Sequence, residues 1–179
     1  GETLNKKSIS RSGAKIGDLL FVSGVLGLSK LGLDNFYSKS KIFYSARKKY
    51  LVPQPRVDLG ITLNNIVNSM IDISDGLIQD ADHLAKNSKL SIVIDMDKIP
   101  LAPIKNLKKD ILLDAALYGG DDYELLFSCK PAYEKLLKKI SLEKNIKLTN
   151  VGIFQKFNKQ YIKFKNGKSL LKKHSYLHF

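Results

Sequence analysis

The sequence predicts an α+β fold, a mixed β-sheet with helices packed on it. Two kinds of segment occur along its 179 residues: short β-rich runs, and longer segments with apolar residues at helical spacing. At 20.1 kDa the chain is long enough for one well-packed domain. Because the last strands lie close together in sequence, we expect them to pair with each other in antiparallel fashion.

The first half of the chain begins with an expected buried strand. The run GDLLFVSG at 17–24 is β-rich and bounded by glycines. Glycine-rich backbone at 25–36 then turns into a helix, and a basic helix is expected over 35–51. The prolines of PQPRVD end this helix, because the residue before each proline is disfavoured in the α region. The segment 58–70 leads into the most polar motif of the chain.

The second half alternates between helices and strands. After the polar motif, Leu77, Ala81 and Leu84 recur at i, i+4 and i+7, which predicts an amphipathic helix. The elements expected after it are a strand at 90–99, a helix at 106–118, a strand at 123–129, a helix at 131–140 with proline in its first turn, and strands at 147–155 and 159–168, the last ending in an Asn-Gly turn.

The formal net charge of +13 raises the question of a nucleic-acid partner. Only three of the 30 basic residues are arginine, the side chain whose planar fork reads base edges and phosphates. The lysines lie in scattered pairs and not in one block, which favours a solvated surface. We therefore expect no nucleic-acid partner, and a Lys-rich module for RNA or DNA is the alternative. The charge still suits a polyphosphate substrate.

Location is indicated by apolar runs and cysteine content. The apolar runs are far too short to span a bilayer, which needs about 20 apolar residues, so no membrane partner is expected. Cys129 is the single cysteine, which excludes a disulfide framework or a cysteine metal cluster. Near the end of an apolar strand it is expected to be a packed thiol. These features predict a cytoplasmic protein.

The stretch MIDISDGL, Met70–Leu77, holds the densest polar group of the chain. Asp72, Ser74 and Asp75 directly follow an apolar stretch, where like charges repel and are costly to bury. On a strand, Asp72 and Ser74 point to the same side, and Asp75 lies where the following helix exposes free N–H groups. Such a set suits Mg²⁺ and nucleotide phosphates. Helix capping explains only one of the three side chains, so a metal–phosphate site is predicted.

Two further polar groups leave alternatives open. In YGGDDYELLF, a glycine pair permits a sharp bend before Asp121 and Asp122. This acid pair suits a metal or a substrate amine, and equally a solvated turn. Arg11 precedes a small-residue turn, where its fork could clamp a phosphate or lie at the surface. The remaining candidates carry no predicted site: Asp95 and Asp97 on one face of a strand, His83 on the surface of a helix, and His174 and His178 without ligand spacing.

From about Arg11 to Phe179 the chain resembles the carboxy-terminal half of the thiamine-monophosphate kinase family. The resemblance is carried, in this order, by RSGAKIGDLLFVSGVLG, PQPR, MIDISDGLIQDADHLAKNS, GGDDYELLF, VGIF and the terminal YLHF. That family belongs to the superfamily of aminoimidazole ribonucleotide synthetase, which also includes selenophosphate synthetase and a hydrogenase maturation protein. The IDISDGL segment is shared across the superfamily, whereas GGDDYELLF and the aromatic-x-His-Phe ending are similar to the thiamine enzyme in particular.

This resemblance implies a function and a set of site residues. The implied reaction is the ATP-dependent, Mg²⁺-assisted phosphorylation of thiamine monophosphate to thiamine diphosphate. The positions of Asp72 and Asp75 match magnesium ligands of the family, and those of Ser74 and Arg11 match residues that contact ATP. The remaining two matches, to residues that bind the thiamine part, are Asp122 and Tyr176. The alternative is another ATP-using enzyme of the superfamily, of the selenophosphate or aminoimidazole ribonucleotide synthetase type.

The resemblance also implies a domain organisation. The family's amino-terminal ATP-binding domain, with its Gly-Gly-Asp-Thr-Thr loop, does not match any part of the sequence. We therefore expect residues 1–10 to be the remnant of a linker from that missing domain, and residues 11–179 to be the C-terminal domain of the kinase. A homodimer is expected for the complete protein through the missing domain, and the 179 residues alone are expected to be inactive.

Overall fold

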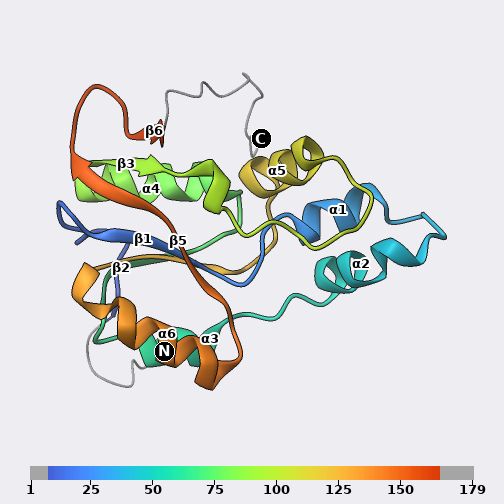
Figure 1. Ribbon diagram of the computed structural model, residues 1–179, viewed down its shortest axis with the longest axis horizontal. Helices are drawn as coiled ribbons and strands as arrows, with labels where there is room; N and C mark the ends of the chain where they lie inside the picture. Colours follow the sequence, from blue (N-terminus) through green and yellow to red (C-terminus); the bar gives the residue numbers. More distant parts are fainter. Residues whose placement is uncertain (1–7, 166–179) are drawn as a thin grey trace.

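A six-stranded mixed sheet forms the centre of the computed structural model, with helices on both faces (Figure 1). The structure describes residues 8–165. The strands are β1 (Leu19–Ser23), β2 (Val67–Asp72), β3 (Leu90–Ile94), β4 (Leu125–Cys129), β5 (Leu148–Lys156) and β6 (Ile162–Phe164). The α-helices are α1 (Leu28–Asp34), α2 (Tyr44–Leu51), α3 (Val57–Leu63), α4 (Leu77–Ser88), α5 (Lys109–Tyr118) and α6 (Glu134–Lys144). Short 3-10 helices are η1 (Lys41–Phe43), η2 (Met96–Lys98) and η3 (Pro131–Tyr133). The predicted α+β class is confirmed.

The strand order is β2-β4-β1-β5-β3-β6. Neighbouring strands are antiparallel except for β3 and β6, which are parallel. The predicted pairing of the last two strands with each other is wrong. The nine-residue β5 already has β1 on one edge and β3 on the other, so β6 adds to the outer edge of β3.

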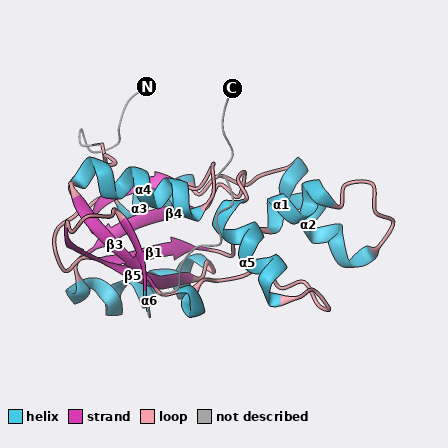
Figure 2. Cartoon of the chain, turned by 90° about the horizontal axis from the view of Figure 1, so that it is seen from above, coloured by secondary structure: helices cyan, strands magenta, loops and turns pink. Residues whose placement is uncertain are grey.

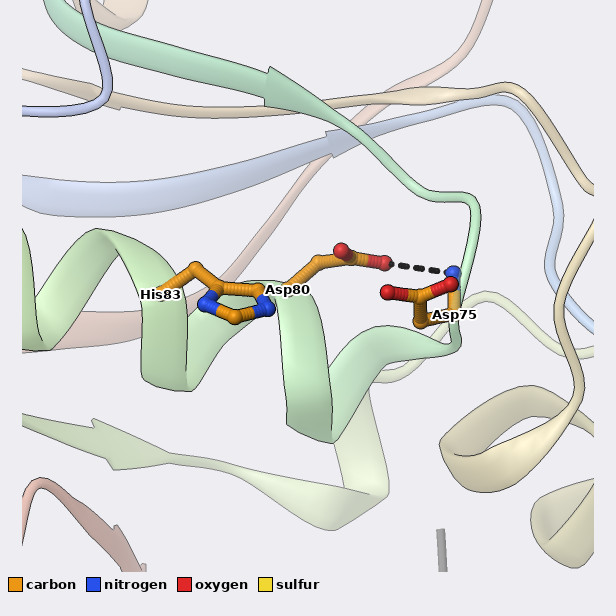
Figure 3. A group of neighbouring side chains, drawn as sticks. All are labelled: Asp75, Asp80 and His83. Atoms are coloured by element: carbon orange, nitrogen blue, oxygen red, sulfur yellow. Dashed lines mark hydrogen bonds between the residues drawn. The ribbon is translucent and has the colours of Figure 1, made fainter. Parts of the chain in front are cut away.

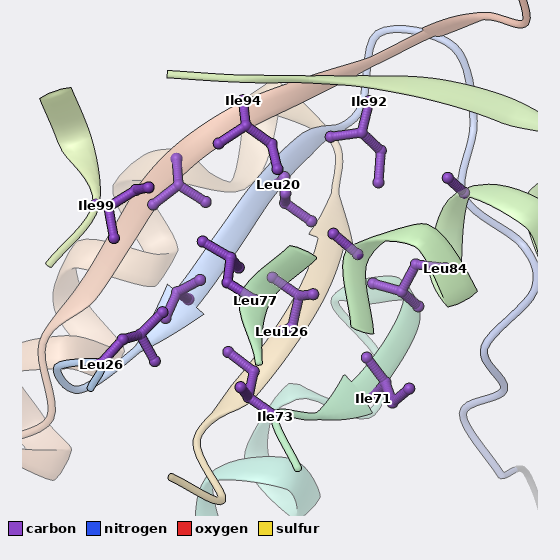
Figure 4. Close-up of a cluster of buried hydrophobic side chains, with 14 of the residues drawn as sticks. Leu20, Leu26, Ile71, Ile73, Leu77, Leu84, Ile92, Ile94, Ile99 and Leu126 are labelled. Carbon is purple, nitrogen blue, oxygen red and sulfur yellow. The ribbon is translucent and has the colours of Figure 1, made fainter. Parts of the chain in front are cut away.

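The two faces of the sheet are packed by alternating residues of the same strands. Leu20 and Val22 of β1 are buried in the cluster beneath α4, together with Leu77 and Leu84 (Figure 4). Phe21, between them in sequence, points to the opposite face and belongs to the cluster covered by α3 and α6. Alternate residues of β1 and the i, i+4, i+7 residues of α4 therefore meet in one core.

A third cluster lies beyond the end of the sheet and is formed by α1, α2 and α5 (Figure 2). We refer to residues 28–51, which contain α1 and α2, as the arm. Its helices cross closely, because a Cβ atom built at Gly32 would lie 2.3 Å from the carbonyl oxygen of Ala46. Leu31 and Ala46 are buried at this crossing. The two helices of the arm are thus packed closely together, and they share a small core with α5, Ala102 and Ile104 beyond the end of the sheet.

Local structure differs from the sequence expectation at two places. β3 ends at Ile94, and Asp95 caps η2 by accepting a hydrogen bond from the backbone N–H of Asp97 (3.3 Å). The predicted strand face of Asp95 and Asp97 is therefore wrong. The basic helix begins only after Ser40, which caps η1. The predicted Asn-Gly turn after β6 lies outside the described residues.

Two further expectations concern the thiol of Cys129 and membrane-spanning helices. Cys129 is fully buried, and burial raises the pKa of its thiol to about 12, which fits a packed thiol and not a nucleophile. No helix within residues 8–165 has the length and apolar character needed to cross a lipid bilayer.

Candidate functional site

The polar motif forms the turn between β2 and α4, and a buried carboxylate holds the turn in place. β2 ends at Asp72 and α4 begins at Leu77. The backbone N–H groups of Ser74 and Asp75 both donate to one oxygen of Asp80, at 3.1 Å each. Figure 3 shows the hydrogen bond from Asp75. Asp80 belongs to the first turn of α4 and is 1% exposed. The helix therefore fixes the position of the loop that precedes it.

The glycine pair of the second polar segment lies directly against this turn. The N–H of Asp121 donates to the carbonyl of Ser74 (3.0 Å), so the two segments run side by side. A Cβ atom at Gly120 would lie 2.2 Å from that carbonyl oxygen. Asp121 itself has a φ of 63°, a left-handed conformation that turns the chain sharply. The two motifs found separately in the sequence thus form one structure, and the glycine permits their close approach.

Three possible metal ligands meet at the start of α4. One ligand atom each from Asp75, Asp80 and His83 lies within 4.8 Å of the others (Figure 3). His83 was expected at the surface; it is partly buried and lies one helical turn after Asp80. Burial raises the pKa of Asp80 to about 7, and the nearby carboxylates of Asp75 and Asp72 add to this effect. A divalent cation would relieve this concentration of negative charge.

Asp72 and Arg11 lie outside this group. Asp72 is exposed at the end of β2 and lines a shallow neighbouring hollow together with Arg56 and Tyr123. Arg11 is exposed on the outer side of β2, where the N–H of Met70 donates to the carbonyl of the residue before Arg11 (3.0 Å). Tyr176 lies outside the described residues. The roles expected of these three residues remain predictions.

A cleft of about 440 Å³ opens between the motif and the arm. One wall consists of the turn residues Ser74 and Asp75, with Gly120 and Asp121 beside them. The cleft is also lined by Tyr118 at the end of α5 and by four residues of the arm, Tyr50, Ser29, Lys30 and Leu33. The structure therefore brings Ser74 and Asp75 of the predicted motif and Asp121 of the acid pair to one cavity. It adds aromatic side chains that the sequence analysis did not single out.

Asp122 faces away from the cleft and holds the start of α1. It is fully buried, and its carboxylate accepts hydrogen bonds from the N–H groups of Gly27 (2.6 Å) and Ser29 (3.1 Å). Burial raises the pKa of Asp122 to about 6. The cleft is lined instead by its neighbour Asp121. The direct substrate contact expected of Asp122 stays a prediction.

Glu124 helps to build the region around the candidate site, and the sequence analysis did not identify it. Its buried carboxylate accepts hydrogen bonds from Ser23 (2.6 Å), from Lys49 (2.9 Å) and from the guanidinium of Arg56 (2.7 and 2.8 Å). Burial opposes its ionisation, but the hydrogen bonds from Arg56 and Ser23 outweigh burial and lower the pKa of Glu124. An acid directly before the apolar run LLF was the signal available in the sequence.

Comparison with known proteins defines the class of the fold. Residues 15–165 match the family described as AIR synthase related protein, C-terminal domain. The chain belongs to this family.

Individual relatives of the chain are named thiamine-monophosphate kinases. The chain is 40% identical over 182 residues to a thiamine-monophosphate kinase of Buchnera aphidicola subsp. Schizaphis graminum, covering 97% of this chain and 56% of that protein. A crystal structure of thiamine-monophosphate kinase from Stenotrophomonas maltophilia K279a superposes with a TM-score of 0.85 at 29% identity, over 93% of this chain and 55% of that one. A structure described as AaThiL complexed with AMPPCP and TMP superposes with a TM-score of 0.76 at 30% identity, over 94% and 53%. The chain thus spans about half the length of the relatives it matches.

Because the two motifs are in close contact, we expect one methyl group added at Gly120 to reduce the stability of the protein strongly. Gly120→Ala should lower the free energy of unfolding by about 1–3 kcal/mol, because the added Cβ collides with the carbonyl of Ser74. Urea denaturation measures this change. Gly60→Ala is the matched control: Gly60 lies within α3, with its nearest foreign atom 3.9 Å from the added Cβ, and alanine favours a helix. Equal effects of the two changes would contradict the proposed close contact.

The raised pKa of Asp80 predicts a pH-dependent stability. Between its ordinary value of 3.8 and about 7, the folded protein holds a proton here that the unfolded chain releases. The stability due to this proton is complete below pH 3.8 and is lost as pH rises through 7. Asp80→Asn, which cannot ionise, should therefore gain stability relative to the parent between pH 4 and pH 8. Urea denaturation with a chelator present measures this difference, and exposed Asp110→Asn is the control. A pH-independent difference for Asp80→Asn would refute the assignment.

Proposed function

We propose that this chain forms part of an ATP-dependent kinase that converts thiamine monophosphate to thiamine diphosphate. The observation that carries the proposal is the cleft between the motif and the arm, which joins Ser74, Asp75 and Asp121 in one cavity. The chain that builds this cleft is 40% identical to a thiamine-monophosphate kinase over nearly its whole length. Phosphoryl transfer requires positioning and charge neutralisation more than covalent chemistry by the protein.

The donor set fits a divalent cation, and we propose Mg²⁺ with Asp72 and Asp75 as ligands. Mg²⁺ prefers carboxylate oxygens and phosphate oxygens and retains several waters. Asp75 and Asp80 present such oxygens at the start of α4, and Asp72 lies at the adjacent end of β2. When bound, the ion would neutralise charge on the transferred phosphoryl group. Asp80 acts through the loop, because it fixes the backbone of Ser74 and Asp75.

We propose Ser74 and Arg11 as contacts to ATP. Ser74 lines the cleft, where its hydroxyl can donate to a phosphate oxygen. Arg11 lies on the outer side of β2 and would reach a nucleotide that extends past the end of that strand. For the thiamine part we propose Asp122 and Tyr176, as the resemblance implies. In this arrangement the reacting phosphates meet near the turn, and the organic group of the acceptor extends toward the arm.

The rest of the active site is proposed to come from outside these residues. The relatives are nearly twice as long as the matched segment, and we propose that their additional domain completes the ATP site and forms a homodimer. We further propose that the protein acts in the cytoplasm.

The proposed metal site predicts a defined loss on substitution. Asp75→Asn should weaken binding of Mg²⁺ or Mn²⁺ by at least about 10-fold, because it removes an anionic ligand. Titration calorimetry, or the paramagnetic signal of Mn²⁺, measures the affinity. The control Asp110→Asn removes the same charge from an exposed position on α5 and should leave the affinity unchanged. An unchanged affinity in Asp75→Asn would remove Asp75 from the metal site.

A composite active site predicts that the 179 residues alone form no thiamine diphosphate. We expect ATP and thiamine monophosphate to remain unconverted in a discontinuous assay with chromatographic detection, because the proposed site needs phosphate-binding groups from outside these residues. Co-expression with the amino-terminal portion of the Buchnera relative should restore turnover if the halves assemble. Measurable turnover by the isolated chain would disprove the composite site.

A further inference from the structure

Two tyrosines line the cleft together with the phosphate motif. Tyr50 of α2 and Tyr118 at the end of α5 both line the cavity, and the backbone of Tyr118 packs against Gly76, next to Asp75. Both tyrosines are partly buried. Their rings offer flat aromatic faces, which suit the organic part of a ligand.

The charge inside the cleft has the opposite sign to the charge of the whole chain. The chain carries +13, but the cleft is lined by the carboxylates of Asp75 and Asp121. Its lysine, Lys30, forms an ion pair with Asp34 on the next turn of α1. Asp121 also accepts a hydrogen bond from the hydroxyl of Tyr123 (3.2 Å), which fixes its position. Tyrosine faces next to carboxylates favour a flat cation over a second anion.

The position of Tyr50 is set before any ligand binds. Its ring packs edge-to-face against Phe36, with centroids 6.3 Å apart. The preceding residue, Lys49, is tied to the buried carboxylate of Glu124 (2.9 Å). Anchoring on both sides reduces the loss of side-chain freedom on binding and so improves affinity. Such anchoring is typical of a recognition surface and is not needed for an exposed tyrosine.

We propose that Tyr50 and Tyr118 are the specificity-determining residues of the acceptor site and hold its cationic heterocycle, with Asp121 supplying the counter-charge. The proposal rests on the proposed function, because that function supplies a substrate with a phosphate and a positively charged ring. It assigns the selection of the ring to the arm and to the end of α5, and the positioning of phosphates to the turn before α4. Glu124 then acts as a positioning residue, since it holds α2 of the arm through Lys49.

Ligand-observed NMR on this chain tests the proposal with thiamine monophosphate as the probe. Saturation transfer detects millimolar affinities, so it remains informative for a partial active site. Tyr50→Ala and Tyr118→Ala should each weaken binding about 10-fold, through loss of stacking and of the cation–π contact. Tyr50→Phe keeps the ring and should bind as the parent does. Tyr44→Ala is the matched control, because Tyr44 lies on the same helix but is 66% exposed and outside the cleft.

A second probe separates ring recognition from phosphate recognition. Phenyl phosphate carries a neutral ring, so it should bind more weakly than thiamine monophosphate, and Asp121→Asn should reduce that difference. If thiamine monophosphate binds the parent but neither alanine variant weakens it, the ring proposal is overturned and the kinase proposal stands. If the parent binds ATP but not thiamine monophosphate, the ring proposal is overturned, whereas absence of turnover by the co-expressed halves would overturn the kinase proposal. Circular dichroism of each variant confirms that it is folded.

Discussion

The buried carboxylate of Glu124 is the constraint on which the arrangement of the site depends. It joins β1 through Ser23, α2 through Lys49, and the segment before α3 through Arg56. A Cβ atom at Gly24 would lie 2.5 Å from this carboxylate, so the neighbouring backbone must be glycine to admit it. Buried ion pairs contribute little net stability, because desolvation offsets much of the attraction. The effect of these ion pairs is to fix positions. Lys49 and Arg56 both donate to Glu124, and this carboxylate holds the two side chains toward the interior.

Three acids after one glycine turn take three different directions. Asp121 faces the cleft, Asp122 binds the start of α1, and Glu124 binds α2 and the segment before α3. Asp121 and Tyr123 both have positive φ, at 63° and 48°, so the side chains do not alternate as they would in a regular strand. One short segment thereby contributes Asp121 to the cleft and anchors both helices of the arm, which also lines the cleft. Under the proposed function, the loop that would contact the ligand also anchors the arm.

Much of the fold could be predicted from periodicity, because strands and helices with one buried face repeat at fixed intervals. The β-rich run between two glycines at 17–24 and the spacing of Leu77, Ala81 and Leu84 identified β1 and α4 correctly. The order of the strands could not be predicted in this way. The order depends on which strand edges remain unpaired once β5 has paired with β1 and β3, and this is decided only when the sheet assembles. The polar motif was visible because acids in an apolar run are conspicuous, but Asp80 and His83 sit at ordinary positions of a helix. They come close to the motif only because the turn before α4 brings Asp75 next to them.

The contrast between a basic chain and an acidic cleft has a chemical consequence. Lysines spread over the surface attract a polyphosphate at long range, within about 10 Å of the surface at ordinary ionic strength. At the cleft, the carboxylates of Asp75 and Asp121 would repel such a ligand. Under the proposed function, the phosphates would therefore enter together with a divalent cation that offsets this repulsion. The same carboxylates would attract a cationic ring, and tyrosine faces in the same cleft would add to that attraction. In that case the acids would make phosphate binding conditional on a cation and would also favour the organic part of the proposed acceptor.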